Sequence, residues 1–416
     1  MAYQPRVTDS ELESRLRATG AVVIEGPRAC GKTASARRLA ASEVLFDLDP
    51  AARHAARVDP SLVLEGATPR LLDEWQLEPQ VWNAVRRAVD DSDAVGRFIL
   101  TGSAVPADEA TRHTGAGRIA RMRMRPMSLY ELGFSTGEIS LEALLDGDPP
   151  RSRDPGLSVA DLAVRVAVGG WPGFRSHAVP DALVAVRGYL EEIRRTDIGR
   201  VDDKRRDPVR VGRLLRSLAR NVATYAATKT LAADAGGDDG PIKDETAAEY
   251  LDALTRLMVV EDQPAWAPHL RSKSRIRRAE KRHFVDPSLA VAALHATPER
   301  LLEDINYLGF LFESLVIRDL RVYAQGIAGT VLQYRDNTGL EVDAIVETAD
   351  GRWGAFEIKL GGRLVEEGAS NLTTFVNRVD TAKPGKPAIV GVITGTGYGY
   401  VRPDGIAVIP IGALAP

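Results

Sequence analysis

The sequence contains almost no cysteine and little histidine. Its 416 residues include one cysteine, Cys30, and six histidines. One cysteine excludes an intrachain disulfide and a zinc site built from several cysteines. The histidines do not show the close spacing of metal-ligand motifs. Composition therefore excludes a disulfide-stabilised protein and a cysteine-based zinc protein.

Long apolar runs and an excess of charge of one sign are also missing from the sequence. No stretch approaches the roughly 20 apolar residues that a membrane span needs. The amino-terminal segment carries Glu11 and Glu13 and lacks the apolar core of a signal peptide. With 54 Lys and Arg against 57 Asp and Glu, the formal net charge is −3, so nucleic-acid binding would require a local basic patch. We expect a cytoplasmic protein without membrane contact.

The bulk composition is otherwise ordinary for a globular chain. Apolar residues make up 44% of the sequence and charged residues 27%, which supports real hydrophobic cores. A chain of 416 residues exceeds the usual size of one domain, so about two to four domains are expected.

A phosphate-binding motif follows the first apolar segment. Residues 22–24 predict a strand, residues 26–33 have the pattern Gly-x-x-x-x-Gly-Lys-Thr, and residues 34–41 predict a helix. A strand before this pattern and a helix after it are the context of a P-loop. The residues expected to bind nucleotide here are Gly26, Pro27, Arg28, Ala29, Cys30, Gly31, Lys32, Thr33 and Ala34.

Each part of this motif has a chemical role in holding a nucleoside triphosphate. Gly26 and Gly31 let the backbone turn tightly and aim its N–H groups at phosphate oxygens. The following helix adds its positive amino-terminal end. We expect Lys32 to reach the β- and γ-phosphates and the Thr33 hydroxyl to hold Mg²⁺. The sequence thus predicts ATP and Mg²⁺ as ligands, against the alternative of a glycine turn that happens to precede a lysine.

Two later strands end in polar residues that suit the same site. One predicted strand ends at Asp73 and Glu74. Asp73 would orient Mg²⁺, and Glu74 would be the general base that polarises the attacking water. A further buried strand would bring Thr101 or Ser103 near the γ-phosphate if it lies beside the P-loop strand. The alternatives are an acidic strand-to-helix turn for the carboxylates and a helix N-cap at Ser103.

A basic run follows these strands and has three interpretations. One arginine, Arg118 or Arg121, could neutralise transition-state charge as an arginine finger. Several could contact nucleic-acid phosphates. Alternatively, positions 121, 123 and 125 share one side of a strand and form a solvated face. The run contains Arg112, Arg118, Arg121, Arg123 and Arg125.

Motifs spread along the first part of the chain occur together in a known family. They are Ile24-Glu25-Gly26-Pro27-Arg28 with the P-loop, Leu72-Asp73-Glu74-Trp75-Gln76, Leu100-Thr101-Gly102-Ser103, Met124-Arg125-Pro126-Met127-Ser128-Leu129 and Gly169-Gly170-Trp171-Pro172-Gly173. Together they resemble the prokaryotic AAA-type ATPases that carry a C-terminal DUF4143 domain. The resemblance implies an ATPase core at residues 1–125 and a helical lid over the nucleotide at residues 126–204. Such lids convert phosphate state into domain motion.

Residues 205–290 predict a winged-helix domain. The expected elements are helices at 209–223, 228–235 and 243–257, followed by strands at 258–262 and 283–286. The basic loop between the strands would release counterions from DNA phosphates, whereas the alternative is a flexible solvated loop. Asp244, Glu245 and Glu249 on the third helix argue against deep entry into the major groove. The residues expected to contact DNA are Arg271, Lys273, Arg275, Arg277, Arg278, Lys281 and Arg282.

Residues 291–416 predict a further α/β domain, in the order helix, three strands, helix, two strands, with the opening helix expected over residues 299–324. Glu357 and Lys359 share one face of the third strand, Asp343 lies on the strand before it, and Glu313 lies on the opening helix. A metal-dependent phosphodiesterase requires such a set, because carboxylates hold Mg²⁺ and a lysine activates the attacking water. The alternative is a half-exposed strand with Glu-x-Lys on its polar face.

This arrangement resembles the PD-(D/E)XK restriction-endonuclease superfamily. The resemblance implies that Asp343 and Glu357 are metal ligands, that Glu313 is an auxiliary ligand, and that Lys359 activates water. The proline that precedes the first acid in the superfamily pattern is missing. A fold can also outlive its chemistry, so the resemblance implies the fold more firmly than DNA cleavage.

The sequence therefore predicts an α/β protein with a P-loop NTPase core of the AAA type, a helical lid, a winged-helix domain and a C-terminal restriction-endonuclease-like α/β domain. We expect a Mg²⁺-dependent ATP hydrolase whose nucleotide state controls a DNA-binding winged-helix and nuclease-like module. One alternative is a nucleotide-dependent switch whose inactive nuclease-like domain only docks DNA or a protein. The other is a DNA endonuclease governed by ATP. DNA is the expected partner, and a homo-oligomer or a protein partner stays open.

Overall fold

A computed structural model describes residues 3–102, 114–201, 206–236, 240, 242–267, 279–379 and 385–416. The described chain divides into two compact units, which we treat separately. The first unit comprises Met1–Pro126, Arg195–Arg206 and Asp252–Val259. The second comprises Met127–Arg194, Asp207–Leu251 and Val260–Pro416. The units thus cut across the boundaries expected at residues 205 and 291.

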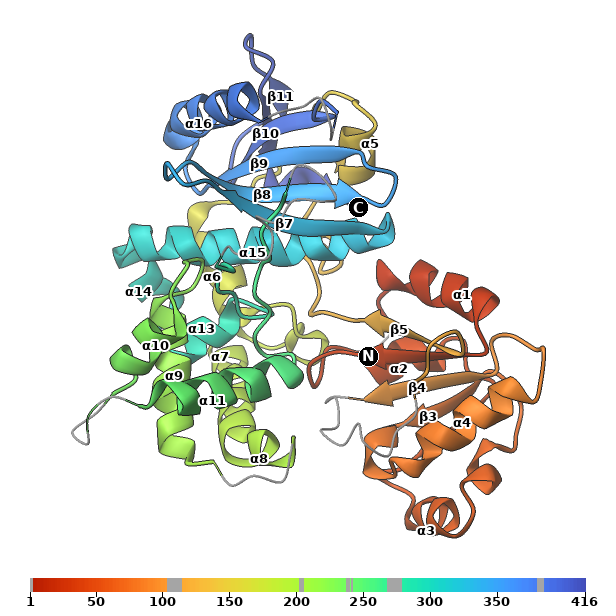
Figure 1. Ribbon diagram of the computed structural model, residues 1–416. Coiled ribbons are helices and arrows are strands. Elements are labelled where there is room, and N and C mark those ends of the chain that lie inside the picture. Colours follow the sequence, from red (N-terminus) through yellow and green to blue (C-terminus); the bar gives the residue numbers. More distant parts are fainter. Residues whose placement is uncertain are drawn as a thin grey trace. The chain divides into compact units, whose positions relative to one another are not determined.

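The first unit is built on a sheet in which the described strands are parallel and run in the order β2-β3-β4-β1-β5 (Figure 1). The P-loop strand β1 lies between β4 and β5, and β4 separates it from β3. The carboxyl ends of parallel strands meet at one edge of a sheet, so β1, β3 and β4 deliver their last residues to the same place. The strands are β1 (Ala21–Glu25), β2 (Ser42–Leu45), β3 (Arg70–Asp73), β4 (Phe98–Gly102) and β5 (Ile119–Arg123).

Helices cover both faces of this sheet, as the continuous apolar strands require. Val23 of β1 packs in a core with Trp82 and Val85, whereas Val22 points to the other face and packs with Leu12 and Leu16. Successive strand residues point to opposite faces, so each strand supplies both cores. The helices are α1 (Thr8–Ala18) and α2 (Lys32–Arg37) on one face, and α3 (Pro50–Val58) and α4 (Gln80–Asp90) on the other.

The middle of the chain is mainly helical. The helices expected in residues 205–290 form at α9, α10 and α11, but the two expected strands are reduced to short antiparallel bridges, Val260 with Phe284 and Gln263 with Lys281. A π-helical turn, Ile193–Asp197, follows α7. The helices are α5 (Leu141–Leu145), α6 (Val159–Val168), α7 (Val179–Glu192), α8 (Ile198–Arg200), α9 (Pro208–Arg220), α10 (Thr228–Asp234), α11 (Asp244–Arg256), α13 (Ser288–Ala293) and α14 (Pro298–Glu303).

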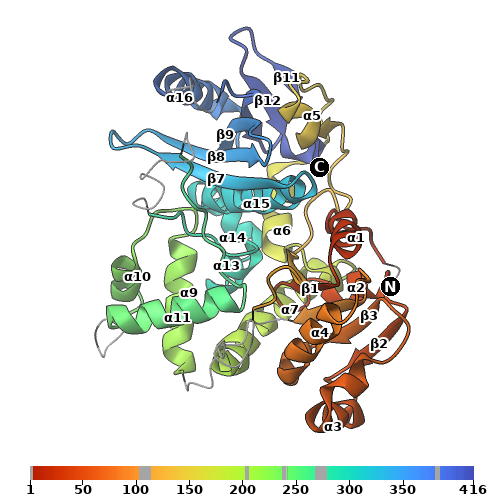
Figure 2. The same cartoon turned by 45° about the vertical axis from the view of Figure 1, so that its right-hand side comes forward.

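A second sheet organises the C-terminal part, with the described strands in the order β11-β12-β10-β9-β8-β7. Helices α15 (Ile305–Gly326) and α16 (Val365–Arg378) lie on its opposite faces in both views (Figures 1 and 2). Strand β9 is central, and residues 353–358 are all buried. The strands are β7 (Gly329–Arg335), β8 (Glu341–Thr348), β9 (Trp353–Lys359), β10 (Ile389–Thr394), β11 (Tyr400–Val401) and β12 (Ala407–Pro410).

The segment that directly follows the first expected wing strand packs into this C-terminal core. Ala265 forms a parallel bridge with Gln333 of β7, and the Trp266 N–H donates to the Gln333 carbonyl. The Trp266 side chain is fully buried. Its ring centroid is 4.8 Å from that of Trp353 and 6.2 Å from that of Phe375. Aromatic rings bury large apolar areas and dominate the energetics of a core. The chain before residue 291 therefore contributes to the C-terminal fold.

The last residues of the chain are held by a segment that directly follows the ATPase core. Strand β13 (Leu414–Ala415) pairs in parallel with β6 (Ile139–Ser140). The Thr136 N–H also donates to the carbonyl of Gly412. None of the helices in the described ranges is long and apolar enough to cross a lipid bilayer.

Candidate functional site

The P-loop connects β1 to α2 in a conformation that its glycines make possible. Gly31 has φ 107°, a left-handed conformation that favours glycine. A Cβ on Gly26 would lie 2.3 Å from the Met124 carbonyl oxygen, because the chain after β5 crosses the loop there. Cys30 is fully buried, which agrees with a small residue filling a tight loop.

The Lys32 side chain folds over this loop. Its ammonium donates to the carbonyl oxygens of Gly26 at 2.8 Å and Pro27 at 2.9 Å, and the residue is 5% exposed. Phosphate oxygens are stronger partners for an ammonium than neutral carbonyls. Lys32 therefore lies where a bound triphosphate would draw it from the loop.

A cluster of oxygen atoms forms beside the P-loop. The Thr33 hydroxyl donates to Asp73 Oδ1 at 2.9 Å, and the Thr101 hydroxyl donates to the same oxygen. This geometry follows from the strand order, since β4 carries Thr101 between β3 and β1. Hydroxyl and carboxylate oxygens are ligands that Mg²⁺ prefers, so Thr33 and Asp73 fit the expected ion. Ser103 lies outside the described residues.

The expected general base, Glu74, follows the cluster in a constrained conformation. Its φ is 53°, a left-handed value that costs a non-glycine residue free energy. The carboxylate accepts a hydrogen bond from the Gln76 side chain. Such backbone conformations cluster at functional sites, where the surrounding structure holds them.

The structure does not bring Arg118 to the nucleotide site of its own chain. Arg118 immediately precedes β5, which pairs in parallel with β1 through Ala21 and Ile119. Its guanidinium forms an ion pair with Asp90 at 2.6 Å. Arg118 thus lies at the amino-terminal edge of the sheet, opposite the P-loop, and its role as an arginine finger stays a prediction. Arg121 lies further along β5 and forms an ion pair with Glu25.

An ion pair that the sequence did not suggest involves a P-loop arginine. Arg28 lies 3.0 Å from Asp197, whose side chain is 5% exposed. Asp197 ends the π-helical turn 193–197, a feature often found at functional sites. Nothing in the local sequence marks this partner, since the two residues are far apart along the chain.

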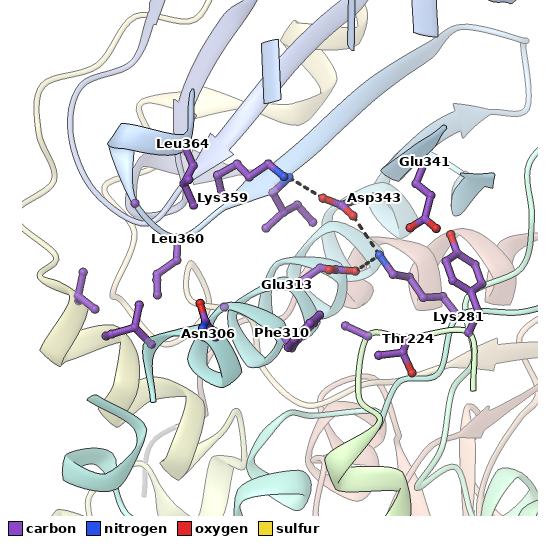
Figure 3. A pocket seen from close by; sticks show the side chains of 17 residues that line it. Thr224, Lys281, Asn306, Phe310, Glu313, Glu341, Asp343, Lys359, Leu360 and Leu364 are labelled. Atoms are coloured by element: carbon purple, nitrogen blue, oxygen red, sulfur yellow. Dashed lines mark hydrogen bonds and ion pairs between the residues drawn. The ribbon is translucent and has the colours of Figure 1, made fainter. Parts of the chain in front are cut away.

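The C-terminal candidates come together as expected. Glu313 of α15, Asp343 of β8, and Glu357 and Lys359 of β9 lie within one group of side chains. A cavity of about 580 Å³ is lined by Glu313, Asp343 and Lys359 together with apolar residues such as Phe310 (Figure 3). Glu357 is only 4% exposed, so the alternative of a half-exposed strand is wrong.

A fifth charged side chain lies in this group. The Lys281 ammonium is 2.5 Å from Glu313 Oε1 and 3.0 Å from Asp343 Oδ1. Figure 3 shows the Lys281 side chain pointing toward both carboxylates. The Lys281 side chain is 4% exposed. Lys281 was expected to contact DNA, and the structure contradicts this because its charge is buried against two carboxylates.

Burial and ion pairing set the protonation of these groups. Burial raises the pKa of Glu313 to about 8 and, with the negative charge of Asp343, raises the pKa of Glu357 to about 8. Burial also opposes ionisation of Asp343, but Lys281 and the Ile358 N–H outweigh it and lower the pKa of Asp343. The same carboxylates raise the pKa of Lys281 well above its usual value despite burial. Lys281 therefore carries a full positive charge.

The side chains of this pocket do not fit a divalent metal ion in the arrangement observed. Among the described residues, no three His, Cys, Asp or Glu side chains gather closely enough to hold a metal. The ammonium of Lys281 lies between Glu313 and Asp343, where two of the expected ligands would meet the ion. A metal-dependent cleavage step therefore has no support in this geometry.

The other residues expected to contact DNA divide into two groups. Arg282 is mostly buried and forms an ion pair with Asp262, so the structure contradicts its DNA role. The remaining residues lie outside the described part of the chain and are Arg271, Lys273, Arg275, Arg277 and Arg278.

Comparison with protein-family models matches three consecutive parts of the chain. Residues 18–133 match the model of an AAA domain. Residues 308–414 match a domain of unknown function, DUF4143. Residues 159–300 match another domain of unknown function, DUF8612, which spans the boundary expected at residue 205.

The chain is also similar to curated and solved proteins. The uncharacterized protein Rv2008c of Mycobacterium tuberculosis is 25% identical over 368 residues, which cover 86% of this chain and 74% of the relative. The uncharacterized protein Mb2031c of Mycobacterium bovis matches with the same figures. A Walker-type ATPase of Pyrococcus abyssi aligns in structure with a TM-score of 0.41 and 14% identity, over 70% of this chain and 96% of that chain.

Proposed function

The chain combines an AAA-type P-loop ATPase domain with a DUF4143 domain, and from this premise we propose that it is a Mg²⁺-dependent ATP hydrolase whose nucleotide state controls its C-terminal module. The observation that carries the proposal is the contact of Thr33 and Thr101 with Asp73 beside the P-loop. Three motifs distant in sequence thereby form one polar site at the carboxyl edge of a parallel sheet.

Each residue of this site has a defined task in hydrolysis. The backbone N–H groups of the P-loop bind the phosphates, and Lys32 neutralises charge on the γ-phosphate oxygens. Glu74 accepts the proton of the water that attacks the γ-phosphate in line. Thr101 holds the Asp73 carboxylate in orientation through its hydroxyl. Thr33 and Asp73 would hold Mg²⁺, which would supply positive charge at the phosphates.

The C-terminal module is proposed to dock DNA or a protein partner with a nuclease-like fold that does not cleave. The ion pairs of Lys281 with Glu313 and Asp343 favour this alternative over an active DNA endonuclease. DNA contact is proposed for the five basic residues at 271–278, because a basic segment binds phosphates through counterion release. Nucleotide-dependent motion of this module would use the ATP site as its switch.

The hydrolysis proposal is tested by comparing Lys32→Ala and Glu74→Gln with the unaltered protein. We expect Lys32→Ala to lose binding of a fluorescent ATP analogue. Glu74→Gln should keep that binding and lose phosphate release by about 100-fold or more, since it lacks the general base. Arg37→Ala is the matched control, because Arg37 lies on α2 in an exposed ion pair with Glu43. Unchanged ATP affinity in Lys32→Ala, or normal turnover in Glu74→Gln, would refute the assignment.

A further inference from the structure

Lys281 occupies the centre of the acidic group in the C-terminal pocket. Its ammonium lies between Glu313 on α15 and Asp343 on β8 (Figure 3). The centroid of the Tyr225 ring is 5.8 Å from the ammonium. An aromatic face attracts a cation, so Tyr225, like the two carboxylates, favours a positive charge at this position. The position is thus surrounded by groups that bind a cation.

The backbone around Lys281 is fixed to the strand that carries Asp343. The Lys281 N–H donates to the Gln263 carbonyl at 3.1 Å, and the Gln263 N–H donates back at 2.8 Å. The Gln263 side chain then donates to the backbone carbonyls of Asp343 and Leu332, at 2.9 and 3.0 Å. Gln263 is fully buried. The backbone of Lys281 is therefore fixed beside the strand of Asp343, within reach of the acidic group.

The carboxylate oxygens of Asp343 and Glu357 already have partners within the chain. Asp343 Oδ1 binds Lys281, and Asp343 Oδ2 accepts the Ile358 N–H at 3.0 Å. Glu357 Oε1 accepts from Asn371 at 2.9 Å, and its Oε2 lies 3.1 Å from the Lys359 ammonium. A buried carboxylate is stable when paired and hydrogen-bonded, and these contacts meet that need without a metal ion.

We propose that the Lys281 ammonium is the resident cation of the C-terminal pocket and stands in the place of a divalent metal. The pocket of the natural protein accordingly binds neither Mg²⁺ nor Mn²⁺. Removal of the ammonium leaves the carboxyl groups of Glu313 and Asp343 adjacent with no cation between them, and a divalent ion can displace the Glu313 proton and bind both groups. Substitution of Lys281 by a neutral residue therefore creates a divalent-metal site. The inference rests on the proposed function only where that function gives the C-terminal module a docking role without cleavage. It does not depend on ATP turnover.

The test is a Mn²⁺ titration of the nucleotide-free full chain, with free Mn²⁺ measured by electron paramagnetic resonance. Lys281→Met removes the charge and keeps the length and apolar stem of the side chain. We expect it to gain one Mn²⁺ site at least tenfold tighter than any in the unaltered protein. That gain should vanish in the double variant Lys281→Met/Asp343→Asn and be absent from Lys281→Arg, which keeps a cation. All of these variants keep the same weak Mn²⁺ binding at the P-loop, so that binding does not affect the comparison between them.

Two results would overturn the proposal. One is a Mn²⁺ site in the unaltered protein that Asp343→Asn removes. The other is a Lys281→Met protein with an unchanged circular dichroism spectrum and no added site. If Lys281→Met does not fold, the comparison of the unaltered protein with Asp343→Asn still decides, because equal binding supports the proposal. Failure of the ATPase assignment would appear separately, as intact nucleotide binding in Lys32→Ala.

Discussion

At the scale of single residues, burial in the C-terminal pocket makes stability depend on pH. Burial and then the charge of Asp343 raise the pKa of Glu357 from 4.5 to about 8. The folded protein therefore keeps a proton on Glu357 at pH values where the unfolded chain has lost it. Stability from this group is fully present below pH 4.5 and is lost as pH rises toward 8.

Glu357→Gln is predicted to weaken this pH dependence. The amide carries no titrating proton, so the fall in the free energy of unfolding between pH 5.5 and 8 should become shallower. The wild-type slope from one such group is at most about 1.4 kcal/mol per pH unit. Urea unfolding of both proteins across this range measures the difference. Glu65→Gln, an exposed substitution, is the control, and equal slopes for Glu357→Gln and the unaltered protein would contradict the assignment.

The residues that sequence alone could place are those whose partners are set by a local motif. Lys32 and Thr33 belong to one continuous P-loop pattern, and their surroundings follow from it. Lys281 stands in a basic run and was expected to face DNA. Its partners Glu313 and Asp343 come from α15 and β8, so only the tertiary fold shows that its charge is buried.

At the scale of elements, helix α15 is tied to three earlier segments by a buried charged network. The Arg318 guanidinium contacts Asp286 at 2.9 Å and Asp319 at 2.7 Å. Asp286 also accepts the Gly170 N–H, and Asp319 accepts the Leu129 N–H. The Gly-Gly-Trp-Pro-Gly and Pro-Met-Ser-Leu motifs of the sequence thus have a structural role, since both supply amides to this network.

Arg318→Met is predicted to destabilise the second unit strongly. It leaves two fully buried aspartates without their counter-charge, and breaking a buried ion pair in this way costs about 3–5 kcal/mol. Arg220→Met is the matched control, because its ion pair with Asp234 is exposed and worth less than about 1 kcal/mol. Urea unfolding followed by far-ultraviolet circular dichroism measures both. Similar midpoints for the two variants would exclude a stabilising role for the network.

The sequence reading missed one element boundary that a local cap sets and one pattern of burial that packing sets. The sequence suggested one helix over residues 299–324, but Asp304 caps a new helix by accepting the Tyr307 N–H, which separates α14 from α15. Alternation suggested one polar face for β9. Helices α15 and α16 bury the two faces of β9, and β8 and β10 occupy its two edges. Which elements lie beside a strand depends on the whole fold.

At the scale of the whole molecule, the sequence predicted the P-loop ATPase core, whereas the winged-helix and nuclease-like domains stay predictions. The ATPase core was expected to end at residue 125, and the first unit does end its main segment at Pro126. It also includes Arg195–Arg206 and Asp252–Val259, which sequence order assigns elsewhere. Local composition does not show that these two later segments belong to the first unit. Trp266 shows the same effect, because it completes a core formed by residues far downstream.

The function of the whole molecule is tested by ATP turnover with and without duplex DNA, followed by electrophoresis of the DNA. We expect DNA to stimulate turnover and to remain intact, because the C-terminal pocket holds a lysine in place of a metal. Serine at 271, 273, 275, 277 and 278 should abolish the stimulation and reduce the salt dependence of DNA binding, whereas Lys281 and Arg282 are left unchanged to preserve their buried pairs.

Each outcome of that experiment assigns the C-terminal module differently. Stimulation with intact DNA supports a DNA-docking switch, and an unchanged salt slope in the five-serine variant would move the DNA contact to another surface. Cleavage that Asp343→Ala abolishes would restore the endonuclease alternative and contradict the cation role of Lys281. Turnover that does not respond to DNA would favour a protein partner, because the hydrolytic site at Lys32, Asp73 and Glu74 would still operate without nucleic acid.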